Sequence, residues 1–289
     1  MKSYFKALSL SVLALLFFFN VIAWGKVFDL NNPQILEVTF FDVGQGDAIF
    51  IETPKGHQIL IDGGPDVSVL EKLGREIPFW DNTLDLIILT HPEKDHLFGL
   101  IEVLKRYRVE NILWTGIVRD TQSYKVWLKG INEEEAKIKI AQSGQKISWG
   151  LDSEGFIEIF YPLENLEGKK FEKANNTSIS SKLIFGQNSF LFTGDAEKSV
   201  ERELMGKGSK IDSDLLKAGH HGSKTSTDPG FVKVVSPKIV VISNGRNNYY
   251  GHPHQETLDT LNKYDISVLR TDQLGDIKIF SDGRKLKIK

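Results

Sequence analysis

The sequence predicts one α/β domain in which two sheets are covered by outer helices. Two observations lead to this fold class. Short runs of β-branched and aromatic residues, bounded by glycine and proline, alternate with helical stretches. The order of strands, helix and strands is also repeated in two halves, with no break in composition between them. A chain of 289 residues is long enough for one sizeable core.

The first half opens with three short strands and continues with helices and strands in turn. Residues 84–90 form an almost continuous apolar run, which is typical of a strand that is covered on both faces. Strands are predicted at 35–43, 44–53, 57–64, 84–90 and 111–116, and helices at 67–75, 96–107 and 123–135.

The second half opens with a predicted meander of three strands at 137–142, 146–150 and 156–162. A hairpin follows at 178–195, with its turn at 186–188. Helices are then predicted at 197–205, 229–235 and 257–264, and strands just before residue 219 and at 238–245, 267–271 and 276–281.

The N-terminus departs from this pattern. Lys2 and Lys6 precede an uncharged run over residues 7–25. A helix of that length would span roughly 28 Å, close to the thickness of a bilayer core. We therefore separate residues 1–25, a signal peptide or membrane anchor, from a folded domain over residues 26–289.

Two interpretations of this N-terminal segment stay open. It is either a cleaved signal peptide, for which residues 21–23 form a poor cleavage site, or an uncleaved anchor with Trp24 at the interface. Both place the domain outside the cytoplasm, because the two lysines favour a cytoplasmic N-terminus. A buried core helix is disfavoured, because the three phenylalanines at 17–19 leave almost no polar face.

Composition limits the chemistry of any site in this chain. The formal net charge is -2, and there are no cysteines. Disulfides and thiolate ligands are therefore excluded, and any metal must be bound by histidine and carboxylate side chains. A dedicated nucleic-acid binder is more often clearly basic, so the charge by itself does not support that class.

A cluster of metal-binding side chains follows the apolar run directly. The segment HPEKDH contains His91, Glu93, Asp95 and His96, two imidazoles and two carboxylates in six positions. A compact turn of this kind can supply two metal ions that lie a few ångströms apart. The alternative is a solvated, charged loop without metal.

Two further segments follow strands of the second half. Asp195 comes after an apolar strand, where it either binds metal or caps the next helix. His220 and His221 are flanked by glycines, which let the backbone come close to a ligand. One of the two histidines is expected to bind metal or to face the scissile group, and the other to orient it. The sequence does not decide which, and a surface pair is the alternative.

A third segment, RNNYYGHPH, ends the strand at 238–245 and contains His252. Near these segments lie basic side chains for phosphate contacts and tyrosines for stacking on bases. They are Lys217, Lys224, Arg246, Tyr249 and Tyr250. Asn175 and Asn176 either hydrogen-bond substrate or cap a turn.

These motifs resemble those of a known family. HPEKDH is similar to the motif His-x-His-x-Asp-His of the metallo-β-lactamase superfamily, with Glu93 at the third position. FDVGQGDA, LIDGG, TGD, KAGHHGSKTS and YGHP resemble, in this order over residues 36–281, the hydrolase domain of the DNA-uptake protein ComEC and its stand-alone relatives. The resemblance implies a four-layer αββα sandwich, here preceded by one N-terminal hydrophobic helix.

The resemblance also implies a dinuclear site with two divalent metal ions, zinc or manganese, and Glu93 would shift the preference toward manganese. Asp62, in LIDGG, is expected to brace the metal loop. The expected metal ligands are His91, Glu93, Asp95, His96, Asp195, His220 and His221. Catalytic roles are expected for Asp95, Asp195, His221 and His252, and substrate contacts for Asn176, Lys224, Arg246 and Tyr250.

The implied function is a metal-dependent hydrolase. It would be a phosphodiesterase or nuclease that attacks DNA outside the cytoplasmic membrane with a hydroxide held between the metals. The expected partners are DNA, the membrane through the N-terminal segment, and a separate DNA-uptake apparatus. A hydrolase of a small phosphodiester or other ester and a catalytically degenerate binding module are the alternatives. Hydrolysis of β-lactams does not follow from the superfamily, since fold does not fix function.

Overall fold

The computed structural model describes residues 12–24, 34–149, 155–208 and 210–289. The chain divides into two compact units, Met1–Gln34 and Ile35–Lys289. In the first unit, residues 12–24 form a helix with an almost entirely apolar sequence, and the rest of the expected signal or anchor segment lies outside the described residues. None of the helices in the described ranges combines the length and the apolar character that crossing a bilayer requires.

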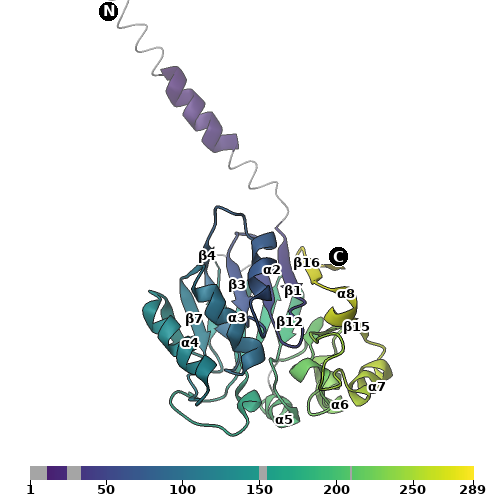
Figure 1. The fold of residues 1–289 in the computed structure, drawn as a ribbon. Helices are drawn as coiled ribbons and strands as arrows, with labels where there is room; N and C mark the ends of the chain where they lie inside the picture. Colours follow the sequence, from purple (N-terminus) through teal and green to yellow (C-terminus); the bar gives the residue numbers. More distant parts are fainter. Residues whose placement is uncertain (1–11, 25–33, 150–154, 209) are drawn as a thin grey trace, which may run out of the picture. The chain divides into compact units, whose positions relative to one another are not determined.

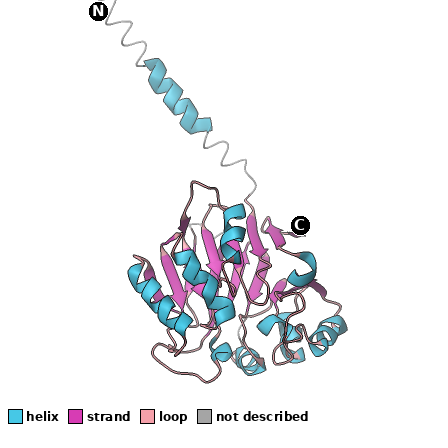
Figure 2. Cartoon of the chain, in the orientation of Figure 1, coloured by secondary structure: helices cyan, strands magenta, loops and turns pink. Residues whose placement is uncertain are grey.

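Two large sheets form the second unit (Figures 1 and 2). In pairing order, the first contains β17 (Leu286–Ile288), β16 (Ile277–Ser281), β1 (Leu36–Phe40), β2 (Ile49–Glu52), β3 (Gln58–Ile61), β5 (Leu86–Leu89), β7 (Asn111–Trp114) and β8 (Lys137–Ile140). The second contains β15 (Ser267–Arg270), β14 (Ile239–Ile242), β13 (Leu215–Lys217), β12 (Asn188–Phe192), β11 (Ser180–Phe185), β10 (Gly155–Tyr161) and β9 (Lys146–Ser148). A small separate sheet pairs β4 (Thr83–Leu84) with β6 (Arg108–Val109).

Helices cover the outer faces of both sheets, which confirms the expected αββα sandwich. On the first sheet lie α2 (Ser68–Glu76), α3 (Lys94–Leu104) and α4 (Gln122–Glu133) (Figure 1). On the second lie α5 (Lys198–Gly206), α6 (Pro229–Val235) and α7 (Gln255–Lys263). Short helical turns complete the domain at α8 (Thr271–Leu274), η1 (Ala174–Thr177) and η2 (Gly219–Gly222). The longer helices begin or end within three residues of their predicted bounds.

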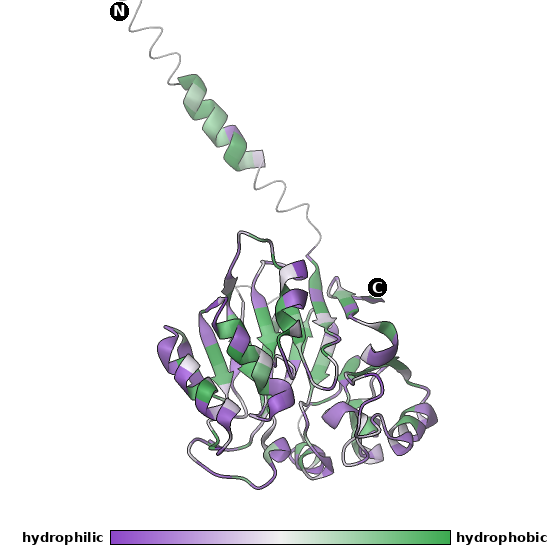
Figure 3. Cartoon of the chain, in the orientation of Figure 1, coloured by the Kyte–Doolittle hydropathy of each residue, from purple (hydrophilic) through white to green (hydrophobic). Residues whose placement is uncertain are grey.

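Alternation along the strands separates the inner core from the outer ones. In β3, Ile59 and Ile61 face the space between the sheets, and Leu60 packs beneath the helices. Phe40 of the first sheet meets Phe192 of the second, with ring centroids 6.2 Å apart. The central strands are correspondingly apolar along their length (Figure 3). This period of two is the signal that made the strands predictable.

The predicted meander at 137–162 is wrong in one respect. Residues 137–140 form β8, which pairs parallel to β7 in the first sheet, whereas β9 pairs with β10 in the second. The chain crosses between the sheets at residues 141–145, where Gly144 donates a backbone hydrogen bond to Ile159. Both segments have the alternating pattern of a strand, and that pattern does not specify which sheet a strand joins.

Parallel strands bring the candidate site residues to one edge of the domain. Strands β3, β5 and β7 are parallel to one another, and so are β12, β13, β14 and β15. The carboxyl ends of such strands meet at one edge, where ligand sites of α/β folds gather. The segments that begin at Asp62, His91, Asp195 and His220 leave these ends.

Two glycines set the position of the helix that carries Asp95 and His96. The backbone N–H of Gly63 donates to the carbonyl of His96 at 2.8 Å, and that of Gly99 donates to Gly64 at 3.0 Å. A Cβ on Gly99 would lie 1.8 Å from the carbonyl oxygen of Gly63. Helix α3 therefore packs on the end of β3 at a distance that no side chain allows.

We predict that Gly99→Ala lowers the free energy of unfolding by about 2 kcal/mol or more, because the methyl group must displace backbone. Gly74→Ala is the matched control, since Gly74 also lies in a helix and its Cβ would meet nothing within 4 Å. That substitution should raise stability by about 0.5–1 kcal/mol. Urea unfolding followed by circular dichroism measures both changes. Equal effects would show that the Gly63–Gly99 contact is unimportant.

A buried carboxyl supports the segment that carries the paired histidines. Glu201 of α5 accepts hydrogen bonds from the backbone N–H groups of Thr227 and Asp228, both at 2.7 Å. Burial raises the pKa of Glu201 to about 7, although these two hydrogen bonds partly oppose the shift. The folded state therefore takes up a proton at this carboxyl between the unfolded pKa and pH 7.

We predict that stability falls as pH rises through this window. The unfolded carboxyl ionises near its ordinary pKa of 4.5, and the folded carboxyl ionises only near 7, so ionisation favours the unfolded state. Between pH 5 and 8, the wild type should lose about 3 kcal/mol relative to Glu201→Gln, which cannot titrate. Urea unfolding across this range tests it, and parallel pH profiles of the two proteins would contradict it.

Candidate metal centre

Four side chains from both halves of the domain converge. Asp95 and His96 lie in the first turn of α3, Asp195 follows β12, and His221 lies in η2 after β13. One ligand atom of each lies within 4.8 Å of the others. The Oδ2 atom of Asp195 is 3.4 Å from His96 Nε2 and 3.3 Å from His221 Nε2. His221 Nε2 is also 3.4 Å from Asp95 Oδ2, so the four groups surround a common point.

Asp62 fixes the orientation of the His96 ring. It accepts hydrogen bonds from the backbone N–H and the hydroxyl of Thr90, at 2.8 and 2.7 Å, and from His96 Nδ1 at 2.8 Å. In the neutral ring, a hydrogen on Nδ1 leaves the lone pair of His96 on Nε2, which faces the cluster. Asp62 adopts a φ of 59°, in the left-handed region, to make these contacts.

His221 is held in the same way by a backbone carbonyl. Its Nδ1 donates to the carbonyl of Ser243 at 2.9 Å, which leaves Nε2 toward Asp95 and Asp195. Both His220 and His221 have positive φ angles, 48° and 54°. Two successive residues in this region are strained unless their surroundings hold them, and such strain is concentrated at functional sites.

His220 is engaged differently from His221. Its Nε2 contacts the amide of Asn175 at 3.2 Å, and its Nδ1 lies 3.1 Å from the hydroxyl of Thr225. It approaches Asp195 Oδ2 only to 3.9 Å, and it is partly exposed. The sequence did not decide which of the two histidines binds metal. The geometry favours His221 as the ligand.

His91 presents a free nitrogen at the same site. Its Nδ1 lies 3.1 Å from the hydroxyl of Thr90 and 3.2 Å from the hydroxyl of Ser178, so both hydroxyls hold this side of the ring. Its Nε2 is buried without a hydrogen-bond partner, and its ring centroid is 4.3 Å from that of His96. Burial, followed by the charge of His96, lowers the pKa of His91 to about 3. The ring is therefore neutral, and its lone pair is available to a metal.

Glu93 is not among the convergent groups. Its carboxylate accepts a hydrogen bond from Arg119 at 2.5 Å, and Arg119 is held in turn by the carbonyl of Phe171 at 3.0 Å. The structure thus gives no support to Glu93 as a metal ligand. Arg119 lies 26 positions along the chain and carries no motif, so the sequence did not reveal this pairing.

A buried lysine and aspartate complete the cluster, and neither was predicted in this role. The ammonium of Lys217 contacts the carboxylate of Asp47, donates to the carbonyl of Gly194 at 3.0 Å and lies 3.7 Å from Asp195 Oδ1. Lys217 is fully buried, so the expected contact with substrate phosphate is wrong. A lysine inside an apolar strand was the available signal, since a buried ammonium requires a buried anion.

The charged groups around the cluster shift one another's pKa values. Burial by itself would lower the pKa of His96 and of His221, but the surrounding carboxylates, Asp195 foremost, raise both well above the usual range. Burial would likewise raise the pKa of Asp195, and the two imidazoles hold it well below its usual range. Positive charge at the centre of the site therefore stabilises the buried carboxylates.

Residues 246–254 of the loop after β14 form the exposed side of the site, which we call its mouth, and His252 of this loop lies beside His220 and His221. The amide nitrogen of Gln45 donates to His252 Nδ1 at 3.3 Å, and the amide oxygen of Gln45 accepts from Gly245 at 3.1 Å, which fixes the amide orientation. His252 therefore carries its hydrogen on Nε2. The Tyr250 ring stacks on His252 at 5.7 Å and is 65% exposed. A row of rings thus leads from His221 through His252 to Tyr250 and the fully exposed Tyr249.

Of the other residues expected to contact substrate, Asn176 is used in hydrogen bonds within the protein, whereas Lys224 and Arg246 are exposed. Asn176 makes two hydrogen bonds with Glu197, both at 3.2 Å, and so holds the start of α5. Lys224 is exposed, and its backbone N–H donates to His254 Nδ1 at 3.2 Å. Arg246 is also exposed and donates from Nε to the carbonyl of Asp272 at 3.1 Å.

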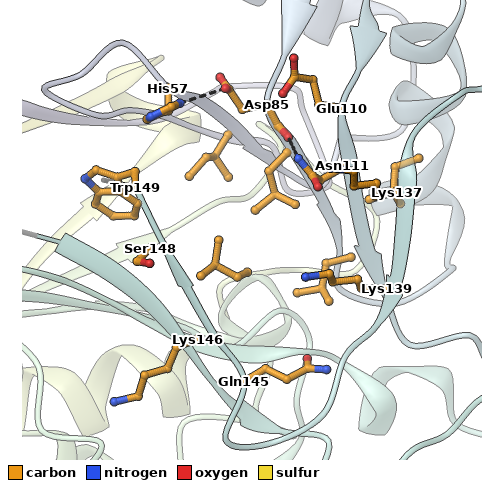
Figure 4. Close-up of a pocket in the computed structure, with 15 residues that line it drawn as sticks. His57, Asp85, Glu110, Asn111, Lys137, Lys139, Gln145, Lys146, Ser148 and Trp149 are labelled. Carbon is orange, nitrogen blue, oxygen red and sulfur yellow. Dashed lines mark hydrogen bonds and ion pairs between the residues drawn. The ribbon is translucent and has the colours of Figure 1, made fainter. Parts of the chain in front are cut away.

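A cavity of about 500 Å³ lies away from this cluster (Figure 4). It lies between the sheets near the amino ends of β3, β5 and β7, and its lining includes His57, Asp85, Lys139 and Trp149. None of the convergent histidines or aspartates lines it. The convergent groups therefore lie outside this cavity, at the carboxyl ends of the parallel strands.

The family follows from comparison with known proteins. Residues 41–246 match the model of the metallo-β-lactamase superfamily. The chain belongs to the metallo-β-lactamase superfamily. It is 35% identical over 262 residues to ComE operon protein 3 of Bacillus subtilis (strain 168), covering 84% of this chain and 32% of that protein. It is 29% identical over 252 residues to Competence protein ComA of Neisseria gonorrhoeae, covering 86% and 32%.

The chain spans about a third of the length of these two relatives. Among solved structures, the metallo-β-lactamase fold protein YhfI from Bacillus subtilis superposes with a TM-score of 0.56. It is 14% identical, and the match covers 86% of this chain and all of YhfI. At that identity the likeness shows the fold alone, and it agrees with the αββα arrangement described above.

The residues of this metallo-β-lactamase site fit a divalent cation. The Nε2 atoms of His91, His96 and His221 and the Oδ1 atom of Asp195 are buried and have no hydrogen-bond partner. Buried polar atoms are rarely left unpaired, and several around one point indicate a missing ligand. Imidazole nitrogens with carboxylate oxygens, without thiolates, suit zinc, manganese and related divalent ions.

We predict that Asp195→Asn abolishes metal binding and the stabilisation that metal provides. A divalent ion at a hundredfold excess over its Kd should stabilise the wild type by about 2.7 kcal/mol. Asp214→Asn is the matched control, because this carboxylate also flanks a strand but pairs with Lys238 and Ser189 at the other end of β13. Metal content and the shift in Tm on adding zinc or manganese measure the effect. Retention of metal by Asp195→Asn would contradict the assignment.

Proposed function

We propose that this chain is a metal-dependent phosphodiesterase that hydrolyses DNA outside the cytoplasmic membrane. The observation that carries the proposal is the convergence of Asp95, His96, Asp195 and His221, with their ligand atoms directed at one point. These four side chains would hold one cation, and His91 together with Asp195 would hold a second. Zinc and manganese both suit this set of donors.

The residues around this point have separable tasks in hydrolysis. Bound divalent ions would lower the pKa of a water molecule and stabilise the negative charge that develops on the phosphodiester. Asp62 and the Ser243 carbonyl keep His96 and His221 in the correct tautomer and orientation. Lys217 offsets the charge of Asp47 and Asp195, so the carboxylates stay ionised and close together.

His252 would donate a hydrogen bond to the phosphate or to the leaving oxygen. Burial, together with the charges of His221, His220 and His254, lowers the pKa of His252 to about 4, so the ring is neutral at pH 7. Gln45 keeps the hydrogen on Nε2, the nitrogen that is left for substrate. A neutral donor fixed in this way suits an anionic group better than a free water does.

Several features support DNA as the substrate. Lys224 and Arg246 are exposed near the mouth and suit phosphate, and Tyr249 and Tyr250 offer faces on which bases can stack. Two matched relatives carry names of competence or of the ComE operon, and the sequence motifs resemble a DNA-uptake protein. The apolar N-terminal segment supports a location outside the cytoplasmic membrane, as a secreted or anchored protein, and a separate uptake apparatus would be its partner.

One observation favours a second substrate class. Lys94, Lys224 and Arg246 are exposed basic residues of the segments that carry the site, and the domain as a whole is mildly acidic, since Lys2 and Lys6 are the only charged residues before residue 26. A small phosphodiester would need no more positive charge than this. Hydrolysis of small esters is therefore the alternative function.

Purified full-length protein, loaded with manganese or zinc, should be offered plasmid DNA, single-stranded DNA and a chromogenic phosphodiester. We expect cleavage of DNA, and a loss of about 100-fold in kcat in His252→Ala, because a positioned hydrogen donor is removed. His57→Gln is the matched control, since this imidazole pairs with Asp85 far from the cluster.

Each other outcome selects one of the alternatives. Activity on the chromogenic ester without cleavage of any nucleic acid would replace DNA by a small phosphodiester. Stoichiometric metal binding without activity on any of the substrates would indicate a catalytically degenerate binding module.

A further inference from the structure

Two large aromatic side chains project from the loop between α2 and β4. Phe79 is 94% exposed and Trp80 is 75% exposed, and their rings form an edge-to-face pair with centroids 4.8 Å apart. Single exposed apolar residues are common, but the exposure of a protruding aromatic pair to water is unfavourable, and a surface that covers the pair removes that cost. We call these two residues the aromatic tip.

The aromatic tip adjoins a basic turn. A hollow of about 350 Å³ next to it is lined by Phe79, Asp81, Arg106 and Tyr107, among others. The Asp81 carboxylate accepts hydrogen bonds from the Thr83 hydroxyl at 2.6 Å and from the Gln58 side-chain amide at 3.0 Å. Three neighbouring cations form ion pairs with glutamates. The pairs are Arg75 with Glu71, Lys105 with Glu102, and Arg108 with Glu110. Arg106 is exposed and has no carboxylate partner among the residues that the structure describes.

The tip lies at the edge of the domain opposite the metal centre. It leads into β4 and then into the amino end of β5, whose carboxyl end carries His91. Strand β1 is antiparallel to β2, which is antiparallel to β3, and β3 is parallel to β5. The amino end of β1 therefore lies at the same edge as the tip. The chain enters the domain at this edge, and the apolar residues 12–24 precede it in sequence.

We propose that the aromatic tip inserts into the interfacial layer of an anionic lipid bilayer, with Arg106 against the lipid phosphates. Tryptophan and phenylalanine beside a free guanidinium are the side chains that the bilayer interface favours. The entry of the chain at this edge, with the apolar residues 12–24 earlier in the same chain, selects lipid as the occupant over a soluble protein. Docked in this way, the domain presents its metal centre away from the membrane.

The chain contains no cysteine, so a single introduced thiol can report lipid contact in the full-length protein. Asn82→Cys places an environment-sensitive fluorophore beside the tip. Gln122→Cys places one at the amino end of α4, on the metal-centre edge. The proteins are reconstituted in vesicles of phosphatidylglycerol and phosphatidylcholine that contain a lipid-borne quencher.

We expect quenching at position 82 and none above background at position 122. Replacing the tip by Phe79→Ser with Trp80→Ser should reduce quenching at 82 to the level at 122. Tyr249→Ser with Tyr250→Ser, an exposed aromatic pair at the opposite edge, should leave it unchanged. Circular dichroism and Tm should match the wild type in both double variants, since all four side chains are largely exposed.

Two results would overturn the proposal. One is equal quenching at positions 82 and 122, which would leave a protein partner as the occupant of the tip. The other is quenching at 82 that persists without the two aromatic side chains. Neither result depends on hydrolytic activity, so the test is independent of the proposed substrate.

Discussion

The ammonium of Lys217 lies between the carboxylates of Asp47 and Asp195, and the metal centre depends on this buried ion pair. Asp47 belongs to the first half of the domain, whereas Asp195 and Lys217 belong to the second. Without the ammonium, Asp47, Asp95 and Asp195 would repel one another in surroundings that screen charge poorly. The pair therefore joins the halves at the point where their ligands must meet.

The fold was largely readable from the sequence, because each element carries its own signal. The period of two in β3 and the apolar run of β5 are local patterns, and they specify strands without knowledge of the partner. The assignment of β8 and β9 to different sheets was not local. It depends on a crossing at residues 141–145, which makes hydrogen bonds to Ile159 and Pro162. No pattern in the neighbouring sequence predicts these bonds.

The same distinction applies to the site. Asp95, His96, Asp195 and His221 were found because they follow strands in short motifs that contain the right donor types. The pairing of Glu93 with Arg119, and that of Lys217 with Asp47, join segments 26 or more positions apart. A sequence lists candidate charges, but it does not say which are used to neutralise one another. The role of Glu93 was therefore out of reach, and the choice between His220 and His221 required their surroundings.

The close packing of Gly63 on Gly99 has a consequence for how metal selectivity can change. Asp95 and His96 both lie on α3, which packs on the end of β3 without room for a side chain between them. Small changes in packing beneath the helix therefore cannot move either ligand. Asp195 and His221 lie on separate loops, where a Cβ on the neighbouring Gly194 or Gly222 would first meet side-chain atoms of Ser178 or Pro253 and not, as at Gly99, the backbone of a strand end. Laboratory evolution toward a larger or smaller ion should therefore accumulate its substitutions around those two loops and leave the α3 side of the centre constant.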